Sequence, residues 1–421
     1  MEYKKILKNG IRIVIEKVPH VYSSVVGFWI DIGSKNESND LRGICHFIEH
    51  MFFKGTKNRS ALELAQSLED TGGSLNAFTD KENTCFFARV LDKYLPTAID
   101  VISDMLLNSS MDITEIEKEK QVVIEEIKMY EDSPDDLVFD LFLQTFWSSH
   151  PLGHEITGSV ETVKTIDRNK ILNYMHNYYS PNNLVIAIAG NLDIEKVENQ
   201  IISLLGDMSN IAPIQTEIPV KLNPGVFIKY KDIEQIHLCI GTKGTSITDK
   251  SRYTLAVIDT ILGGGMSSRL FQEIREKRGL VYNIHSFQGL YRPDGVFGIY
   301  AGTSLENIKQ VIELVLKEFG KIKNGEISPL ELVKAKEYLK GGLLLSLEAV
   351  KNRMMRLARN ELFFKRLIPI EEIIEDVDNV SLDDVIKMAQ NIFSSDILTL
   401  AIVGPLKELP FDIKEMYKKE I

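Results

Sequence analysis

The strongest constraint on the fold is a segment that occurs twice in the chain, 214 residues apart (404 − 190). Asn177-Tyr-Tyr-Ser precedes the apolar run 184–190, and Asn391-Ile-Phe-Ser precedes the apolar run 398–404. The apolar residues before these motifs keep the same offset: Val163, Ile166 and Ile171 match Val377, Val380 and Val385. A register held over about 40 residues is typical of an internal duplication. The sequence therefore predicts two similar domains.

The local patterns favour an α+β fold for each domain, with a mainly antiparallel sheet packed against helices. Asn9-Gly10 lies between the segments Tyr3–Lys8 and Ile11–Glu16 and predicts a β-hairpin. Val21–Ile32 and Leu75–Thr79 have the composition of strands. The apolar periodicity of Ile44–Phe53 predicts a helix.

The repeat and the prolines together suggest where the chain divides. At 421 residues the chain is too long for one ordinary domain. We expect an N-terminal domain at 1–210 and a homologous C-terminal domain at 225–421. The linker is expected at 207–224, where the pattern is interrupted by Pro213, Pro219 and Pro224.

The composition excludes several classes of protein. A net charge of −11 argues against a nucleic-acid-binding protein. The three cysteines, Cys45, Cys85 and Cys239, form no CxxC pair, which argues against a disulfide framework or a thiolate zinc site. The N-terminus lacks the pattern of a signal peptide, and no apolar run has the length of a membrane span. We therefore expect a cytoplasmic protein that binds neither nucleic acid nor membrane.

The chemistry is concentrated in His46-Phe-Ile-Glu-His50. Residues three and four apart on a helix share a face, so His46, Glu49 and His50 project together. Two imidazoles at this spacing can hold one zinc ion, while the carboxylate between them reaches a water at the open coordination position. This order of residues is the inverted form of the common zinc-protease motif. The N-terminal domain at 1–210 is therefore expected to bind zinc, whereas the C-terminal domain at 225–421 lacks this motif.

A zinc ion held by two histidines needs a third protein ligand, which is usually a carboxylate. The acidic segment Thr114–Asp132 offers Glu119, Glu125 and Glu126. Glu119 and Glu126 are seven residues apart (126 − 119) and would share a helical face. The pattern alone does not choose among these carboxylates.

A family resemblance makes the choice. The run from His46 to Thr56, His-Phe-Ile-Glu-His-Met-Phe-Phe-Lys-Gly-Thr, followed by Glu119 and Glu126, closely resembles the pitrilysin, insulysin and mitochondrial processing peptidase family. The family's third ligand stands where Glu126 stands, 76 residues after His50 (126 − 50). The resemblance covers essentially the whole chain, and the two-domain form looks like bacterial relatives of the processing peptidase β-subunit. It also includes the segments 72–79, 150–153 and 267–282.

The resemblance implies a zinc metalloendopeptidase that hydrolyses short unstructured peptides or leader segments. His46, His50 and Glu126 would bind one zinc ion per chain. Glu49 would act as the general base, and Glu119 would orient a ligand histidine.

The same resemblance implies contacts with the substrate. The family's counterpart of Asn76, Ala77 and Phe78 is an edge strand to which an extended peptide adds as a further strand. Arg275 and Tyr282 match an arginine and a tyrosine that contact the substrate backbone and the oxyanion. They are seven residues apart (282 − 275) and would share a helical face if the helix continued past Gly279.

The resemblance finally bears on assembly. Large members of the family join four such domains into a closed chamber, whereas this chain would supply two. We therefore expect a homodimer in which Arg275 and Tyr282 of one subunit face the zinc of the other. Two alternatives stay open: a catalytically silent peptide-binding or structural subunit of a larger complex, and one half of a heteromer. Because the four residues of the zinc centre are all present, an active enzyme is favoured.

Overall fold

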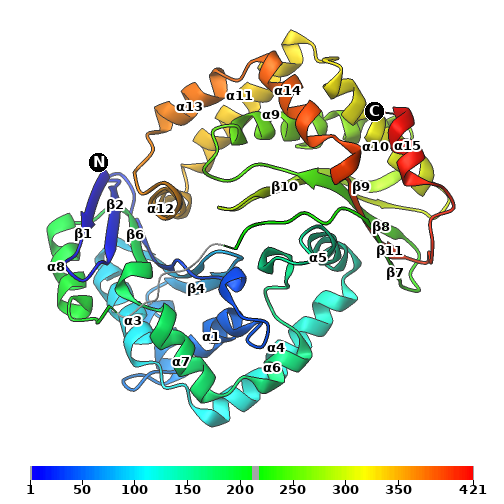
Figure 1. Ribbon diagram of the computed structural model, residues 1–421. Coiled ribbons are helices and arrows are strands. Elements are labelled where there is room, and N and C mark those ends of the chain that lie inside the picture. Colours follow the sequence, from blue (N-terminus) through cyan, green and yellow to red (C-terminus); the bar gives the residue numbers. More distant parts are fainter. Residues whose placement is uncertain (1, 211–217, 421) are drawn as a thin grey trace. The chain divides into compact units, whose positions relative to one another are not determined.

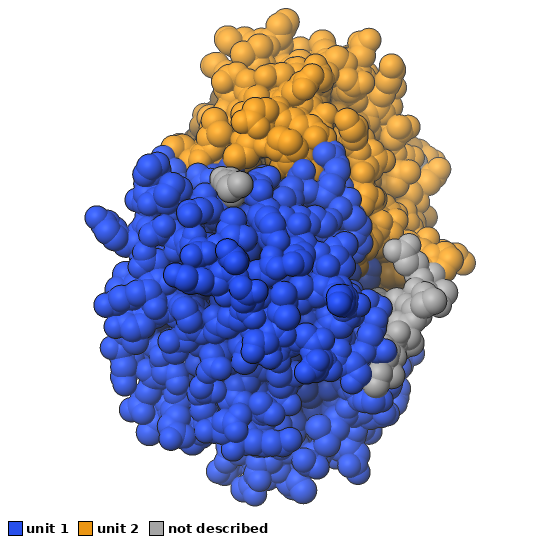
Figure 2. All heavy atoms as spheres, turned by 90° about the vertical axis from the view of Figure 1, so that its left-hand side faces the viewer, with its two compact units in different colours: residues 1–128, 154–216, 346–367 blue, residues 129–153, 217–345, 368–421 orange. Residues whose placement is uncertain are grey.

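The computed structural model describes residues 2–210 and 218–420 and divides into two compact units. Unit 1 comprises residues 1–128, 154–216 and 346–367, and unit 2 comprises residues 129–153, 217–345 and 368–421. Figure 2 shows the atoms of the two units in different colours. Part of the expected linker, residues 211–217, lies outside the described residues.

Unit 1 is built on a six-stranded sheet with the order β1-β2-β6-β3-β5-β4. Strands β2 and β6 are parallel, and the other neighbours are antiparallel. The β1–β2 hairpin turns at Gly10, which has a φ of 103°. The strands are β1 (Glu2–Ile6), β2 (Arg12–Lys17), β3 (Ser23–Ile30), β4 (Ser74–Thr79), β5 (Thr84–Leu91) and β6 (Leu184–Gly190).

Helices cover both faces of this sheet, which explains why β6 is buried along its whole length. Ile186 and Ile188 face the larger core beneath α1, whereas Val185 and Ala187 face α12. The helices of unit 1 are α1 (Ile44–Phe52), α2 (Ala61–Glu69), α3 (Leu95–Asn108), α4 (Ile113–Asp132), α6 (Val160–Thr165), α7 (Arg168–Tyr178), α8 (Ile194–Leu205) and α12 (Val350–Arg359), with short helical turns η1 (Ser34–Asn36), η2 (Asp92–Tyr94), η4 (Pro181–Asn183) and η6 (Asn360–Phe364). The last residues of α4, after Lys128, belong to unit 2.

Unit 2 repeats this topology with a five-stranded sheet in the order β7-β11-β8-β10-β9. Its strand β11 is parallel to β7 and antiparallel to β8, as β6 is parallel to β2 and antiparallel to β3. The two strands of the 214-residue repeat thus occupy equivalent places. The strands are β7 (Val226–Tyr230), β8 (Ile236–Lys243), β9 (Val281–Leu290), β10 (Gly295–Thr303) and β11 (Thr399–Gly404).

One face of the unit 2 sheet packs against most of the unit's helices, and the other face packs against α5 (Figure 1). The helices are α5 (Pro134–Phe146), α9 (Arg252–Leu262), α10 (Ile308–Lys323), α11 (Pro329–Ser346), α13 (Ile370–Asp378), α14 (Leu382–Ile392) and α15 (Ile413–Glu420), with shorter turns η3 (Pro151–Gly153), η5 (Phe271–Glu276) and η7 (Ser395–Ile397). Two sheets packed against helices are the α+β architecture expected from the sequence, which is confirmed.

The compact units differ from the contiguous domains expected at 1–210 and 225–421, because each half of the chain contributes one helix to the other unit. Helix α5 comes from the N-terminal half and buries Val138 and Phe142 with Ala401 of unit 2. Helix α12 comes from the C-terminal half and buries Met354 with Trp29 of unit 1. Each sheet has two apolar faces, and the exchanged helix covers the second one. In the described part of the chain, every helix is too short or too polar to cross a bilayer.

Candidate zinc site

The histidine motif lies on α1. The start of this helix is fixed by the conformation of Gly43 and by hydrogen bonds to Glu37. Gly43 precedes the helix with a φ of 88°, a conformation that favours glycine. The buried carboxylate of Glu37 accepts hydrogen bonds from the backbone N–H groups of Gly43 (2.7 Å) and Cys45 (2.8 Å). These are among the N–H groups that a helix leaves without partners at its first turn.

The structure brings His46, His50 and Glu126 together. The two Nε2 atoms are 3.2 Å apart, and Glu126 Oε2 is 3.4 Å from His50 Nε2 and 3.7 Å from His46 Nε2. In a tetrahedral zinc site, metal–ligand distances of about 2.0–2.1 Å place neighbouring ligand atoms roughly 3.3 Å apart. Two imidazole nitrogens and a carboxylate oxygen at these separations therefore fit a zinc ion.

Glu119 lies beside this triangle and is hydrogen-bonded to His50. Its Oε1 accepts a hydrogen bond from His50 Nδ1 (2.8 Å), which turns Nε2 towards Glu126. Its Oε2 contacts the ammonium group of Lys54 (2.6 Å). Although burial opposes ionisation, the hydrogen bonds from His50 and Lys54 hold the pKa of Glu119 below its usual value.

The electrostatics of the metal-free triangle are those of a site for a cation. Burial and the nearby charge of His50 lower the pKa of His46 to about 4. Burial also acts to lower the pKa of His50, but hydrogen bonds to Glu119 and Glu126 outweigh it and raise the pKa to about 9. The hydrogen bond from His50 lowers the pKa of Glu126. At neutral pH the imidazole of His50 therefore carries a second proton in the metal-free site, and a metal ion bound at Nε2 would displace it.

Glu49 projects from the same helix and is largely buried. Burial raises the pKa of its carboxyl group. The charge of His50 acts to lower this pKa, and the charge of Glu126 acts to raise it. The hydroxyl of Thr79, at the end of β4, donates a hydrogen bond to the carboxylate. This hydrogen bond links the motif helix α1 to β4, the strand that contains Asn76, Ala77 and Phe78.

Strand β4 is an edge of the unit 1 sheet, as the sequence analysis expected for Asn76, Ala77 and Phe78. Asn76 is exposed, and Ala77 packs on the core beneath α1. Phe78 points to the other face, where its ring meets that of Trp29 edge-on at 5.3 Å. The ring of Phe78 thus contributes to packing within unit 1. The outer backbone edge of β4 has no neighbouring strand among those described.

Arg275 and Tyr282 lie in unit 2 and do not share a helical face. The helical turn η5 ends at Glu276, and Gly279 reverses the chain with a φ of 63°. Tyr282 is the second residue of β9, and its side chain is exposed. The strand brings the ring back to Arg275, whose guanidinium lies 5.8 Å from the centre of the tyrosine ring and 4.6 Å from that of Phe271.

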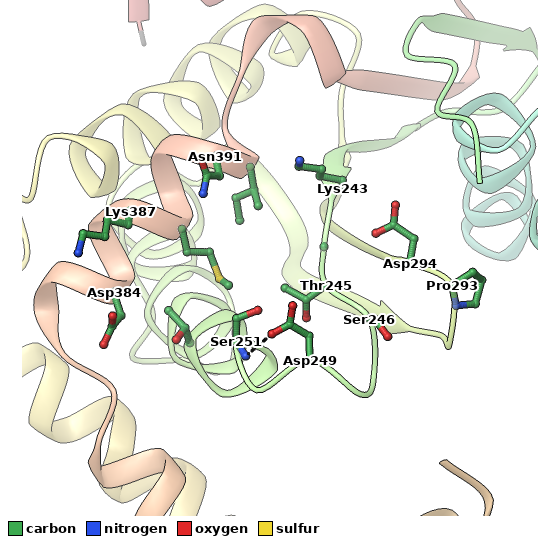
Figure 3. A pocket seen from close by; sticks show the side chains of 14 residues that line it. Lys243, Thr245, Ser246, Asp249, Ser251, Pro293, Asp294, Asp384, Lys387 and Asn391 are labelled. Atoms are coloured by element: carbon green, nitrogen blue, oxygen red, sulfur yellow. Dashed lines mark hydrogen bonds between the residues drawn. The ribbon is translucent and has the colours of Figure 1, made fainter. Parts of the chain in front are cut away.

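Unit 2 also contains a cavity of about 610 Å³ between α14 and the loop after β8 (Figure 3). Lys243, Thr245 and Asp294 line it on one side, and Asn391 of the repeated motif lines it on the other. The buried hydroxyl of Thr245 has no hydrogen-bond partner among the described residues. None of the site residues expected from the sequence lines this cavity.

Three residues contact the site although the sequence did not predict a role for them. Lys54 is four residues after His50 (54 − 50), a spacing that puts it near the same helical face. Thr79 has the strand parity of Ala77, which could have placed it on the side of α1. Glu37 lies in a loop, where no local pattern predicts that it reaches the start of the motif helix.

Family models match most of the chain. Residues 12–160 match the model described as insulinase (peptidase family M16), and residues 165–339 match the peptidase M16 inactive domain. The chain is 40% identical to an uncharacterized zinc protease of Bacillus subtilis, covering 96% of this chain and 98% of the relative. It is 36% identical to an uncharacterized zinc protease of Streptomyces coelicolor, covering 96% of this chain and 89% of the relative.

Solved structures share the fold at lower identity. A protease from Helicobacter pylori superposes with a TM-score of 0.88 at 23% identity, covering 96% of this chain and 99% of that one. A peptidase M16 inactive domain from Pseudomonas fluorescens gives 0.90 at 18% identity, covering 97% and 100%. A chain of complex III2 from Candida albicans gives 0.85 at 20% identity, covering 99% of both chains.

Proposed function

Because the chain belongs to the insulinase family of peptidases, family M16, we propose that it is a zinc-dependent endopeptidase. Its substrates would be short unstructured peptides or leader segments. The observation that carries this proposal is the triangle of His46, His50 and Glu126, whose ligand atoms lie within 4.8 Å of one another. The names of the relatives support zinc as the metal.

In this proposal His46, His50 and Glu126 hold one zinc ion per chain. When bound, zinc lowers the pKa of water at its open position and polarises a carbonyl group. Glu49 takes the proton from the attacking water and delivers it to the leaving amine. Glu119 keeps His50 oriented through the hydrogen bond to Nδ1.

The substrate would bind in an extended form along the open edge of β4. An added strand is held through its backbone, so the contacts of Asn76, Ala77 and Phe78 would favour flexible peptides over folded proteins. Arg275 and Tyr282 would donate hydrogen bonds to the substrate backbone and to the developing oxyanion. In the proposed homodimer, these two side chains come from the second subunit.

The alternative is a catalytically silent peptide-binding or structural subunit. The shared fold with a chain of complex III2 is compatible with that role. The complete set of His46, Glu49, His50 and Glu126 favours the active enzyme, because a silent subunit has no need for a general base beside three metal ligands.

The test compares cleavage of a quenched, unstructured peptide by wild type and by Glu49→Gln at equal zinc content. Glu49→Gln keeps the size of the side chain but removes the base, so we expect full zinc binding and a loss of kcat of at least about 100-fold. Peptide binding without cleavage by zinc-loaded wild type would instead support the silent subunit.

A further inference from the structure

Thr79 is the last residue of the edge strand β4, and hydrogen bonds order the backbone on both sides of it. It pairs with Thr84 of β5 in the last register position of the ladder. The turn that follows is closed by Asp80, whose backbone N–H donates to Asn83 O (2.8 Å). Asp80 Oδ1 also accepts hydrogen bonds from the backbone N–H groups of Glu82 (2.7 Å) and Asn83 (2.6 Å).

The alternation of β4 decides which way Thr79 points. Leu75 and Ala77 pack on the core that includes α1, and Phe78 packs on the opposite face. Thr79 has the parity of Ala77, and its hydroxyl reaches the carboxylate of Glu49. Threonine is branched at Cβ, so few χ1 positions are open to it and the hydroxyl is held in place.

Glu49 needs such a donor for a physical reason. A carboxylate that is largely buried is costly unless it is hydrogen-bonded, and a long side chain without a partner samples several rotamers. From this geometry we propose that Thr79 is a positioning residue, which holds the carboxylate of Glu49 in place for proton transfer and joins the peptide-binding strand to the general base. The inference rests on the proposed function, since it presupposes that Glu49 is the base.

The first experiment separates positioning from substrate binding. Thr79→Val keeps the shape of the side chain and removes the hydroxyl, and Thr79→Ser keeps the hydroxyl. With the quenched peptide, we expect Thr79→Val to lower kcat about tenfold with KM within about twofold of wild type and with full zinc content. Thr79→Ser should recover most of the kcat.

Thr84→Val is the matched control. It removes the hydroxyl of the register partner, which donates to Ile32 O (3.0 Å) and not to Glu49. We expect its kcat to stay within about twofold of wild type. The inference is overturned if Thr79→Val retains its kcat, if only KM rises, or if Thr84→Val loses as much kcat as Thr79→Val.

A second measurement needs no turnover. In metal-free protein, Thr79→Val should lower the free energy of unfolding in the wild-type background and have less than half that effect in a Glu49→Ala background. If the wild type cleaves no peptide but this coupling is present, the proposed function fails and the contact stands. Additive effects of the two substitutions would overturn the contact itself.

Discussion

At the scale of single residues, Glu119 of the candidate zinc site makes a different contact with each of its two carboxylate oxygens. One oxygen accepts from His50 Nδ1 at 2.8 Å, and the other contacts Lys54 Nζ at 2.6 Å. Lys54 thus acts with His50 to lower the pKa of Glu119, and it contacts the oxygen that His50 leaves open. Residues that orient a ligand histidine contribute to metal affinity even though they do not touch the metal.

We therefore predict that Lys54→Met weakens zinc binding about tenfold, because Glu119 loses the cation that fixes its second oxygen. Lys54→Arg should stay close to wild type. Competition with a chromophoric chelator of known affinity measures the change. Lys57→Met, which alters an exposed lysine on the same loop, is the matched control. An unchanged zinc affinity in Lys54→Met would show that Glu119 needs no second partner.

At the scale of elements, Glu37 ties a loop to the start of the motif helix. The residue is 5% exposed, and its carboxyl group accepts two backbone hydrogen bonds, from Gly43 and Cys45. Burial raises its pKa to about 8, although both hydrogen bonds act to lower it. In the unfolded chain the same group has a pKa of about 4.3. The folded state therefore binds an extra proton between these two values.

The sign of the pH dependence follows from this difference. Where the folded state binds more protons than the unfolded chain, stability falls as pH rises. We predict that metal-free wild type loses stability relative to Glu37→Gln between about pH 5 and pH 8, by at most roughly 3–5 kcal/mol. Urea unfolding of both proteins across this range gives the difference. A difference that does not change with pH would mean that Glu37 is already ionised in the folded protein.

The elements that could be predicted are those with a strong local pattern. The expected helix Ile44–Phe53 and the expected strand Leu75–Thr79 agree with α1 and β4 to within one residue. The place of Tyr282 could not be predicted, because heptad spacing from Arg275 suggested a helical face whereas Gly279 starts a turn into β9. Of the site, the three ligand positions came from the motif and the family resemblance. The contact of Glu37 depends on tertiary packing and left no local signal. For Thr79, strand parity indicated the face of the sheet but not the partner, which tertiary packing decides.

At the scale of the whole molecule, the exchange of α5 and α12 shows the limit of local patterns. An amphipathic helix reveals which of its faces is buried but not which sheet it covers. Met354 of α12 places its sulfur 3.3 Å from Trp29 Nε1, and Arg353 and Arg356 pair with Glu16 of β2. Neither contact could be inferred from helical periodicity. The repeat predicted two similar domains, whereas long-range packing decided which segments complete them.

The two sets of proposed catalytic groups belong to different units, with Glu49 in unit 1 and Arg275 in unit 2. We predict a homodimer in which each working site combines Glu49 of one subunit with Arg275 of the other. Glu49→Gln and Arg275→Ala should each be nearly inactive alone. In a mixed dimer, however, the Arg275→Ala subunit supplies an intact Glu49, and the Glu49→Gln subunit supplies an intact Arg275.

Co-expression of the two variants therefore tests the arrangement directly. Random assembly makes half of the dimers mixed, and each mixed dimer has one of its two sites intact, so activity should recover to about a quarter of wild type. Two different affinity tags, used in sequence, isolate the mixed species and establish that it forms. If mixed dimers form but stay inactive, each subunit must supply its own Arg275. A protein that is monomeric and fully active at nanomolar concentration would contradict the dimer itself. A monomer has no second subunit, so Arg275 of another chain could not then be required for catalysis.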